Sequence, residues 1–315
     1  MIPQRIVVAG AGGYVGGRLV AALAARPGVE PVALVRRRRP WLAGSEQVEL
    51  DLLEPGTNLT GALAGAKAVV HLAGPSEVVA ARAPATVLAD TVAISAALGA
   101  AAVEAGVGRF VYLSTTHVYG TRAAPGAVLT EDLRPEPRHP YAIARLASEH
   151  VLAGLGVDLV ALRLTNTVGA PADVAVDRWS LVVNDLCRQA ATEGVLRLRS
   201  DGLQWRDFVA LGDAVGVVAD IALGAGRAGT WNLGSGTPIT VRAVAGLVAD
   251  AWEACTGHRP PLEAPAPAGP PTEAHVVDTD GLAALGLRCS SPLPAAVAEV
   301  AAFCHEHRVW LGRST

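Results

Sequence analysis

The chain has 315 residues, 51% of them hydrophobic, which is enough for one large α/β unit or for a core with a smaller attached domain. This composition excludes a disordered or fibrous protein. A net charge of −3 gives no overall basic field, so we expect no nucleic acid and no anionic membrane surface among its partners.

The first residues, Met1-Ile2-Pro3-Gln4-Arg5, run directly into an apolar strand, and we expect no signal peptide because an apolar region with a cleavage site is missing. No stretch reaches the 18 or so uncharged apolar residues that a membrane helix needs. The four cysteines are scattered without a CxxC pair. Reduced thiols and a cytoplasmic location are the expectation.

The first part of the chain alternates short β-branched runs with alanine-rich helical runs, a pattern typical of βαβ units and a parallel sheet. The expected strands are Arg5–Ala9, Val32–Val35, Gln47–Leu50, Ala68–Leu72, Phe110–Leu113 and Leu159–Leu164. The expected helices are Tyr14–Arg26, Asn58–Ala64, Pro84–Ala105 and Tyr141–Leu155.

After Gly169 the alternation stops and a mixed region follows. Its expected helices are Leu181–Thr192, Asp213–Leu223, Val241–Thr256 and Pro294–His307. We therefore expect an α/β protein: a Rossmann-type, doubly wound parallel sheet over residues 1–168, which binds NAD(P), and a smaller mixed substrate-binding region over residues 169–315. Some strands and helices of the second region are expected to return to the Rossmann core.

The helix expected at Pro84–Ala105 has few polar positions on any face, as is typical of buried helices. Burial in the core and burial in a subunit interface shared with Tyr141–Leu155 both fit this pattern. We expect a homodimer.

A glycine-rich turn follows the first strand and opens the first helix. Its glycines permit a tight turn and let a pyrophosphate approach backbone N–H groups at the helix N-terminus. The cofactor contacts expected here are Gly10, Gly13, Tyr14, Val15 and Gly16.

The second strand ends at Val35, where an NAD-selective site places an acid to hold the ribose 2′-hydroxyl. Arg36 and Arg37 follow instead, and arginine accommodates a 2′-phosphate. We therefore expect NADP(H) to be preferred over NAD(H). Asp51 and Leu52, at the end of the third strand, are placed to meet the adenine.

Several segments follow in a characteristic order and spacing: VHLAG at 70–74, FVYLSTTHVYG at 110–120, HPYAIAR at 139–145, LRLTNTVG at 162–169 and DGLQWRDFV at 201–209. Together they resemble the extended short-chain dehydrogenase/reductases, especially the nucleotide-sugar epimerases, dehydratases and ketoreductases. The resemblance covers essentially the whole chain. It implies that the cofactor lies against Leu72, Ala73 and Gly74.

By this resemblance Tyr141 is the general acid/base, and Thr115 binds the substrate oxygen beside it. A phenol, with a pKa of about 10, needs a fixed cation to work as a base near neutral pH. The family supplies a lysine four residues on, which also binds the cofactor ribose; here that position holds Arg145. The only lysine, Lys67, precedes the fourth strand, at the far end of the sheet.

Two further positions depart from the family. Thr91 stands where an asparagine is expected, and the acid of the sugar 4,6-dehydratases is replaced by Thr116 and His117, which makes dehydration the least favoured reaction. Arg145 either fills the role of the lysine or leaves catalysis weakened or routed through another proton path.

For the substrate, the resemblance implies a sugar nucleotide gripped through its diphosphate. The expected contacts are Ser76, Thr116, His117, Asn166 and Arg206. A second diphosphate arginine, expected shortly before His275, is missing. The sequence CHEH at 304–307 lacks metal-ligand spacing, so no metal is expected.

Three interpretations follow. The first is an NADPH-dependent ketoreductase acting on a keto-sugar nucleotide or a similar polyhydroxylated metabolite, and the arginine run favours it. The second is a nucleotide-sugar epimerase acting at C4 with a tightly held cofactor. The third is a cofactor-binding protein with little turnover.

Overall fold

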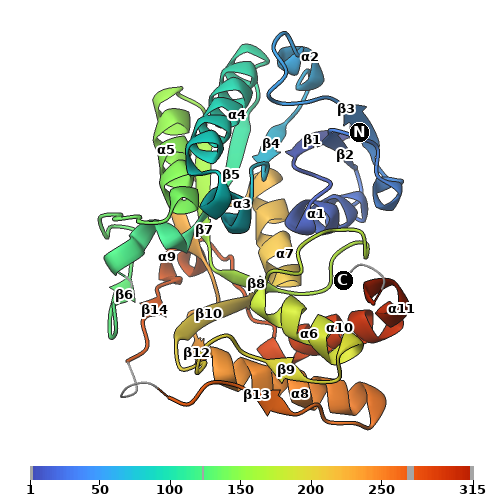
Figure 1. Ribbon diagram of the computed structural model, residues 1–315. Helices are drawn as coiled ribbons and strands as arrows, with labels where there is room; N and C mark the ends of the chain where they lie inside the picture. The colour runs from blue at the N-terminus through green and yellow to red at the C-terminus, as the bar shows by residue number, and fades with distance from the viewer. Residues whose placement is uncertain (1–2, 123, 268–272, 313–315) are drawn as a thin grey trace.

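The structure is a computed structural model that describes residues 3–122, 124–267 and 273–312 (Figure 1). Within these residues, seven parallel strands form one sheet in the order β11-β7-β5-β4-β1-β2-β3. The strands are β1 (Gln4–Ala9), β2 (Val29–Val35), β3 (Glu46–Glu49), β4 (Ala68–His71), β5 (Arg109–Thr115), β7 (Leu159–Leu164) and β11 (Gly229–Leu233). The order reverses between β1 and β4, and this switch point is where open α/β sheets bind their ligands.

The sheet is buried on both faces because its side chains alternate between two cores. Ile6 and Val8 of β1 point into one core, under α1 (Tyr14–Ala24) and α7 (Leu211–Ala222). Val7 and Ala9 point into the other, under α4 (Pro84–Glu104), with α5 (Pro140–Gly154) beside it (Figure 1). The expected Rossmann-type architecture is confirmed.

The helix α4 is apolar and long enough to cross a membrane by length and composition, and among the described residues no other helix is. In the fold it packs along α5, and α2 (Leu59–Ala62) and α3 (Glu77–Arg82) also contact it. Its Leu98, Ala101 and Ala102 are buried in the core shared with the sheet.

A second layer lies below the sheet (Figure 1). Three helices contact one another there: α6 (Val182–Thr192), α8 (Val241–Thr256) and α10 (Leu293–Glu306), with α11 (Arg308–Leu311) against α6. They share a core with the small sheet β12-β10-β8, in which β8 spans Asn166–Val168, β10 Trp205–Ala210 and β12 Pro238–Thr240.

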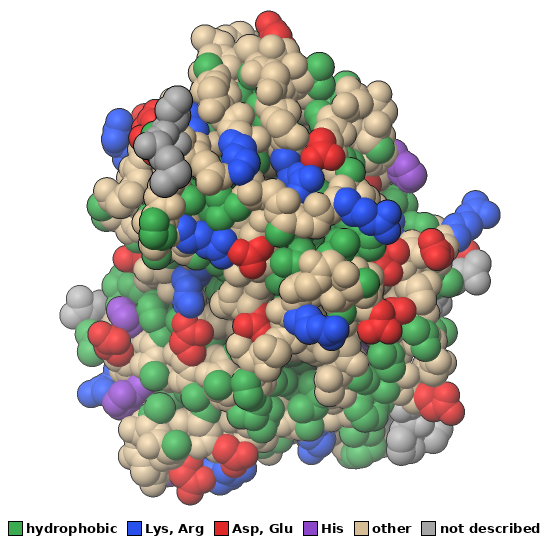
Figure 2. All heavy atoms as spheres, turned by 180° about the vertical axis from the view of Figure 1, so that it is seen from behind, with side chains coloured by type: hydrophobic (Ala, Val, Ile, Leu, Met, Phe, Trp, Pro, Cys, Tyr) green, Lys and Arg blue, Asp and Glu red, His purple; other side chains and the backbone are tan. Residues whose placement is uncertain are grey.

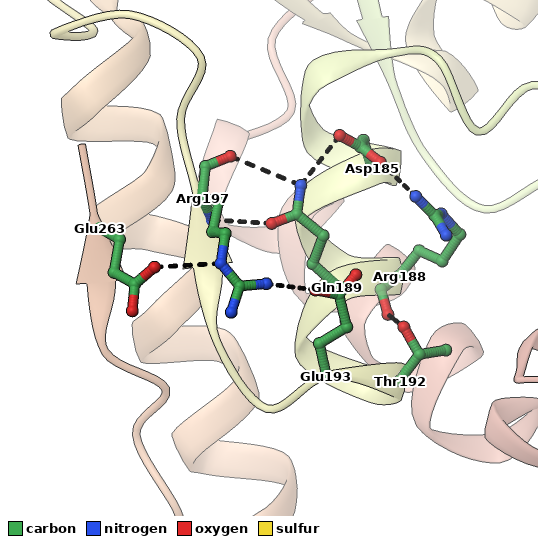
Figure 3. A network of polar contacts seen from close by, with 7 residues as sticks. All are labelled: Asp185, Arg188, Gln189, Thr192, Glu193, Arg197 and Glu263. Carbon is green, nitrogen blue, oxygen red and sulfur yellow. Dashed lines mark hydrogen bonds and ion pairs between the residues drawn. The ribbon is translucent and has the colours of Figure 1, made fainter. Parts of the chain in front are cut away.

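A polar network joins α6 to the strand pair β9 (Leu196–Arg197) and β13 (Leu262–Glu263) (Figure 3). The amide of Gln189 accepts from the backbone N–H of Arg197 at 2.7 Å and donates to Asp185 at 2.9 Å. The guanidinium of Arg197 meets Glu263 at 3.0 Å. These contacts hold β9 and β13 against α6 in the second layer.

The sequence expectations missed the shortest elements. Besides α3, α11 and the strands β8, β9, β12 and β13 named above, they are the strands β6 (Val128–Leu129) and β14 (Val276–Val277), which pair with each other, the helix α9 (Asp280–Ala284) and the 3₁₀ turns η1 (Pro40–Leu42) and η2 (Thr116–Arg122). The strand β11, from the second half of the chain, completes the sheet by pairing with β7.

Candidate active site

The glycine-rich turn connects β1 to α1 under tight steric constraint. Gly10 has φ +86°, and a Cβ there would lie 2.7 Å from the backbone nitrogen of Ala73. A Cβ on Gly16 would lie 2.2 Å from the carbonyl oxygen of Gly10. Gly13 is the N-cap of α1 and brings no side-chain hydrogen bond, and the first turn of the helix has no acid. The exposed N–H groups and the missing side chains fit a dinucleotide pyrophosphate.

The side chain of Tyr14 points away from this turn. It is buried, and its hydroxyl donates to the carbonyl oxygen of Gly169 at 2.7 Å. Burial raises the pKa of this phenol. We expected Tyr14 to contact the cofactor, but only its backbone can do so. Its ring instead connects α1 to Gly169 in the second half of the chain.

Beyond β2 the basic run bends back over the glycine turn. Arg36 and Arg37 are exposed. Arg39 lies over Gly12, where a Cβ would be 3.4 Å from its Cγ, and its guanidinium stacks 5.3 Å from the ring centroid of Trp41. The side chain of Gln47 clamps the backbone of Arg39 through two hydrogen bonds of 2.8 and 3.0 Å. The structure thus brings Arg39, which we had not assigned to the site, closest to the glycine turn.

Asp51 and Leu52 follow β3. The carboxylate of Asp51 accepts from the backbone N–H of Leu53 at 3.0 Å, an Asx turn that leaves Asp51 exposed. Leu52 is half-buried against the core under α4.

Tyr141 lies in the first turn of α5 and Arg145 one turn later on the same face. The Arg145 guanidinium carbon is 5.2 Å from the Tyr141 ring centroid and 5.8 Å from that of Tyr112, a fully buried residue of β5. Arg145 also donates to the carbonyl oxygens of Ala73 at 3.4 Å and Leu113 at 3.3 Å. The guanidinium therefore sits between two phenols, where the sheet meets α5.

Space for this guanidinium comes from Gly74, because a Cβ there would lie 2.9 Å from the nearest guanidinium nitrogen. Arg145 is 5% exposed, and it has no carboxylate partner within the described part of the chain. Burial alone would lower its pKa, but Tyr141 and Tyr112 outweigh burial, so the pKa of Arg145 lies above its ordinary value. A fixed, permanently charged cation thus stands beside Tyr141.

Lys67 lies at the other end of the sheet, before β4, where it donates to the carbonyl oxygen of Leu223 at 2.9 Å. Thr91 of α4 is buried, and its carbonyl oxygen accepts from the hydroxyl of Ser95 at 2.9 Å. Lys67 therefore supplies no cation near Tyr141, and the side chain of Thr91 is uncharged.

Thr115 is the last residue of β5 and is buried. Its hydroxyl oxygen accepts from the backbone N–H of His117 at 3.2 Å. The hydroxyl hydrogen remains available to donate, as binding a substrate oxygen requires.

A cavity of about 250 Å³ lies where η2 follows β5, and neither Thr115 nor Tyr141 is among its lining residues. The lining comprises Thr116, His117, Gly120, Leu129, Thr165, Asn166, Arg206, Asp207, His275 and Val277. Four of the five expected substrate contacts share this cavity, while Ser76 caps the N-terminus of α3 outside the lining. Gly120 makes the turn feasible, because its φ is +53° and a Cβ would lie 1.8 Å from the carbonyl oxygen of Glu136.

Arg206 is the cation of the cavity. Its guanidinium donates to the carbonyl oxygen of Trp205 at 2.9 Å, and no carboxylate within the described residues pairs with it. Burial lowers its pKa. The neighbouring Asp207 is engaged elsewhere, since its carboxylate accepts from the backbone and hydroxyl of Ser235 at 2.9 and 3.0 Å. A half-buried cation without a carboxylate partner is a binding point for an anion.

Sequence reasoning missed Thr165 and His275. The hydroxyl of Thr165 is buried without a hydrogen-bond partner among the described residues. Its position directly before Asn166 was a usable signal. His275 reaches the cavity because the strand after it, β14, pairs with β6, and no local sequence pattern indicates that pairing.

The structure thus has a dinucleotide cradle after β1, a tyrosine beside a buried cation at the start of α5, and a polar cavity where β5 and β7 end. This arrangement defines an enzyme that uses a nicotinamide dinucleotide on a small polar substrate. The chain belongs to the NAD dependent epimerase/dehydratase family, whose model matches residues 6–234. The resemblance seen in the sequence is confirmed, and the protein is an NAD(P)-dependent enzyme of the reductase and epimerase class.

A relative of established activity is the GDP-6-deoxy-D-mannose reductase of Pseudomonas aeruginosa, 31% identical over 78% of this chain and 80% of the relative. Among solved structures, the UDP-glucose 4-epimerase of Thermus thermophilus in complex with NAD is 26% identical, with a TM-score of 0.80 over 95% of this chain and 99% of that one. MoeE5 in complex with UDP-glucose and NAD is 26% identical, with a TM-score of 0.76 over 99% of both chains.

Proposed function

We propose that this protein is an NADP(H)-dependent ketoreductase that acts on a keto-sugar nucleotide or a similar polyhydroxylated metabolite. The observation that carries the proposal is Arg206, which has no carboxylate partner among the described residues and lines the same cavity as Thr116, the residue after Thr115. A guanidinium of this kind matches a diphosphate. The relatives that act on or bind a GDP- or UDP-sugar support the same substrate class.

In the proposed reaction a ketone gains a hydride at carbon and a proton at oxygen. A bound nicotinamide dinucleotide supplies the hydride chemistry. Tyr141 transfers its phenolic proton to the substrate oxygen, and Thr115 donates a hydrogen bond to that oxygen. Arg145 holds its charge 5.2 Å from the Tyr141 ring centroid and so stabilises the phenolate left behind.

The cofactor preference rests on the end of β2. Val35 is buried and carries no acid for a ribose 2′-hydroxyl. Arg39 lies over Gly12 and is held by Trp41 and Gln47, so we assign it the 2′-phosphate of NADP(H). Arg36 and Arg37 add positive charge on the exposed side of the same run.

The first experiment denatures the purified protein, identifies any released nucleotide by mass, and titrates the native protein with NADPH and NADH. We expect a protein that binds NADPH more tightly than NADH. Arg39→Gln should weaken NADPH binding by about tenfold or more, since a charge-assisted hydrogen bond is worth about 1.5–3 kcal/mol, and should leave NADH binding unchanged. Arg38→Gln is the matched control, because only the backbone of Arg38 is engaged, with Glu49.

The epimerase is the second candidate, favoured by the likeness to the Thermus thermophilus UDP-glucose 4-epimerase. It predicts retained NAD(H) that added NADPH does not displace, and interconversion of two sugar nucleotides without net oxidation. That result would overturn the ketoreductase. Binding of NADPH without conversion of any keto-sugar nucleotide would instead favour a cofactor-binding protein with little turnover.

We further propose a homodimer in the cytoplasm. The helices α4 and α5 pack side by side, and both present large apolar side chains to solvent: Leu88 and Val103 on α4 and Ile143 on α5. All four cysteines are free thiols, in keeping with a reducing compartment.

A further inference from the structure

Two histidines share the cavity with Arg206. His117 comes from η2, and His275 comes from the residues just before β14. Within the described residues neither imidazole forms a hydrogen bond or an ion pair, so both rings have free nitrogens. One guanidinium and two imidazoles, from three separate parts of the chain, thus line one cavity.

The charged groups around these rings are engaged with other partners. Glu77 of α3 faces His117 but is paired with Arg178 at 2.8 Å. His139, at the start of α5, also faces His117, and its Nδ1 accepts from the backbone N–H of Tyr141 at 3.2 Å. His275 faces Arg206 and Asp207, and Ser235 occupies the carboxylate of Asp207.

Without a bound anion, both imidazoles favour the neutral form. Desolvation and the charge of Arg206 lower the pKa of His275, and the same two causes, in the same order, lower that of His117. His117 is exposed towards the cavity, so this desolvation is partial. A dianionic ligand would reverse the balance, because it adds negative charge beside rings whose neighbouring carboxylates, Glu77 and Asp207, are already engaged with Arg178 and Ser235.

We propose that His275 is a second phosphate-binding residue beside Arg206, and that it takes up a proton when a nucleoside diphosphate sugar binds. This inference rests on the proposed substrate class and deepens it. His275 lines the cavity together with Arg206, and its imidazole has no hydrogen-bond partner among the described residues. As an imidazolium it donates one charge-assisted hydrogen bond to the diphosphate.

The proton linkage has a definite sign. The diester diphosphate of a nucleotide sugar keeps its charge over the whole range from neutral to weakly acidic pH. In the protein without ligand, the pKa of His275 is lower than the ordinary value of about 6.5, so its imidazole is mainly neutral at pH 7. Affinity should therefore rise as the pH falls from about 7.5 to 5.5, by at most tenfold per pH unit for one proton taken up.

The test is calorimetric titration of the full chain with UDP-glucose and, separately, GDP-mannose. Each titration is run at several pH values and in two buffers of different ionisation enthalpy, which reports the protons taken up. For the wild type we expect uptake of a substantial fraction of one proton near pH 6.5, and an affinity about three- to tenfold higher at pH 5.5 than at pH 7.5.

His275→Gln should abolish most of this uptake and flatten the pH dependence, because the amide can still donate but cannot titrate. His258→Gln, at an exposed position away from the cavity, is the matched control and should behave as the wild type. Thermal unfolding checks that both variants fold.

The outcomes separate the two levels of the proposal. If neither nucleotide sugar binds, the proposed substrate class fails. If one binds with no proton uptake, or if His275→Gln keeps the wild-type uptake, the role of His275 fails while the substrate class stands. If His117→Gln alone removes the uptake, the proton belongs to the other ring and the inference is wrong.

Discussion

Arg145 is a buried cation without a carboxylate partner among the described residues, and its main polar contacts are two carbonyl oxygens and two phenols. Such a group contributes little to stability, because the cost of burying the charge offsets what its contacts gain. A charge kept at that cost implies a role beyond the fold. In the proposed reaction that role is to stabilise the phenolate of Tyr141, which needs a fixed positive charge nearby.

Arg145→Met should therefore separate activity from stability. We expect ketone reduction to fall by about 10²–10⁴-fold, the usual size of an acid–base contribution. We expect the free energy of unfolding to change by less than about 2 kcal/mol, because removal of the charge offsets the donor lost by the two carbonyls. Steady-state kinetics and urea unfolding measure the two quantities.

Arg82→Met is the matched control, because Arg82 is an exposed arginine on α3, outside the cavity lining. It should leave both quantities unchanged. Arg145→Lys should recover at least about tenfold of the lost activity, since it restores a point charge one helical turn from Tyr141. An Arg145→Met variant with normal turnover would remove Arg145 from the mechanism.

At the scale of elements, α5 is held to the sheet by a buried ion pair. Glu149 lies one turn beyond Arg145 and meets Arg163 of β7 at 2.8 Å, with both side chains 7% exposed. The hydroxyl of Ser114 on β5 also donates to Glu149, and Arg163 donates to the hydroxyl of Tyr119 at 3.2 Å. The pair sets how Tyr141 and Arg145 face the sheet.

Glu149→Leu should cost about 3–5 kcal/mol of unfolding free energy, because it leaves Arg163 buried without a counter-ion. The double change Glu149→Leu with Arg163→Leu should cost less than the single change, since no unpaired charge remains. Urea unfolding of the two variants measures the difference. Equal or greater loss in the double variant would show that the pair matters through packing rather than charge.

The turn between β1 and α1 makes a sharper prediction. Gly16→Ala should abolish cofactor binding, because a Cβ 2.2 Å from the Gly10 carbonyl oxygen must displace the backbone of the cradle. Gly216→Ala, in the middle of α7 with no atom within 4 Å of the added Cβ, should instead stabilise the protein by about 0.5–1 kcal/mol. NADPH titration and thermal unfolding check the pair. Intact NADPH binding by Gly16→Ala would place the cofactor elsewhere.

The strands most easily predicted were those buried on both faces. Ile6 to Ala9 form an uninterrupted apolar run because α-helices cover each side of the sheet. The strand β11 gave no such signal, since Trp231 and Asn232 stand in its middle. Asn232 belongs there because its side chain donates to the carbonyl oxygens of Leu129 and Asp278, at 2.8 and 3.0 Å. Only the assembled fold shows those acceptors.

The candidate site divides in the same way. Thr115, at the end of β5, and Asn166, just beyond β7, could be placed from the chain because parallel strands end at one edge of the sheet. Arg39 could not be distinguished from Arg36 and Arg37, since its direction depends on the clamp by Gln47. The place of Tyr112, fully buried against Arg145, follows from the packing of α5 on β5 and from no motif.

At the scale of the whole molecule, charge gives no extended field. Figure 2 shows acidic and basic side chains interspersed over one face, with hydrophobic side chains between them. With a net charge of −3, the attraction for the proposed anionic substrate and cofactor has to come from local groups such as Arg206 and Arg39. Arg39 lies over the glycine turn that follows β1, and Arg206 lies in the cavity lined by residues that follow β5 and β7.

Association with a second copy is the remaining prediction at this scale. Val103 on α4 is 52% exposed and Ile143 on α5 is 38% exposed, and the two helices pack along each other. Apolar side chains left in water on adjacent helices favour burial against the same surface of another copy, which gives a closed two-fold dimer.

Sedimentation or light scattering should therefore give twice the chain mass for the wild type. Val103→Glu combined with Ile143→Glu should give the monomer, because a glutamate buried without a partner opposes the interface. Val309→Glu, at a 63% exposed position on α11, should leave the dimer intact. A wild type that is monomeric at every concentration would exclude the dimer, and a dimer that survives the paired change would locate its interface elsewhere. Because α5 also carries Tyr141 and Arg145, a monomer with lower turnover would show that the interface steadies the helix on which the proposed chemistry depends.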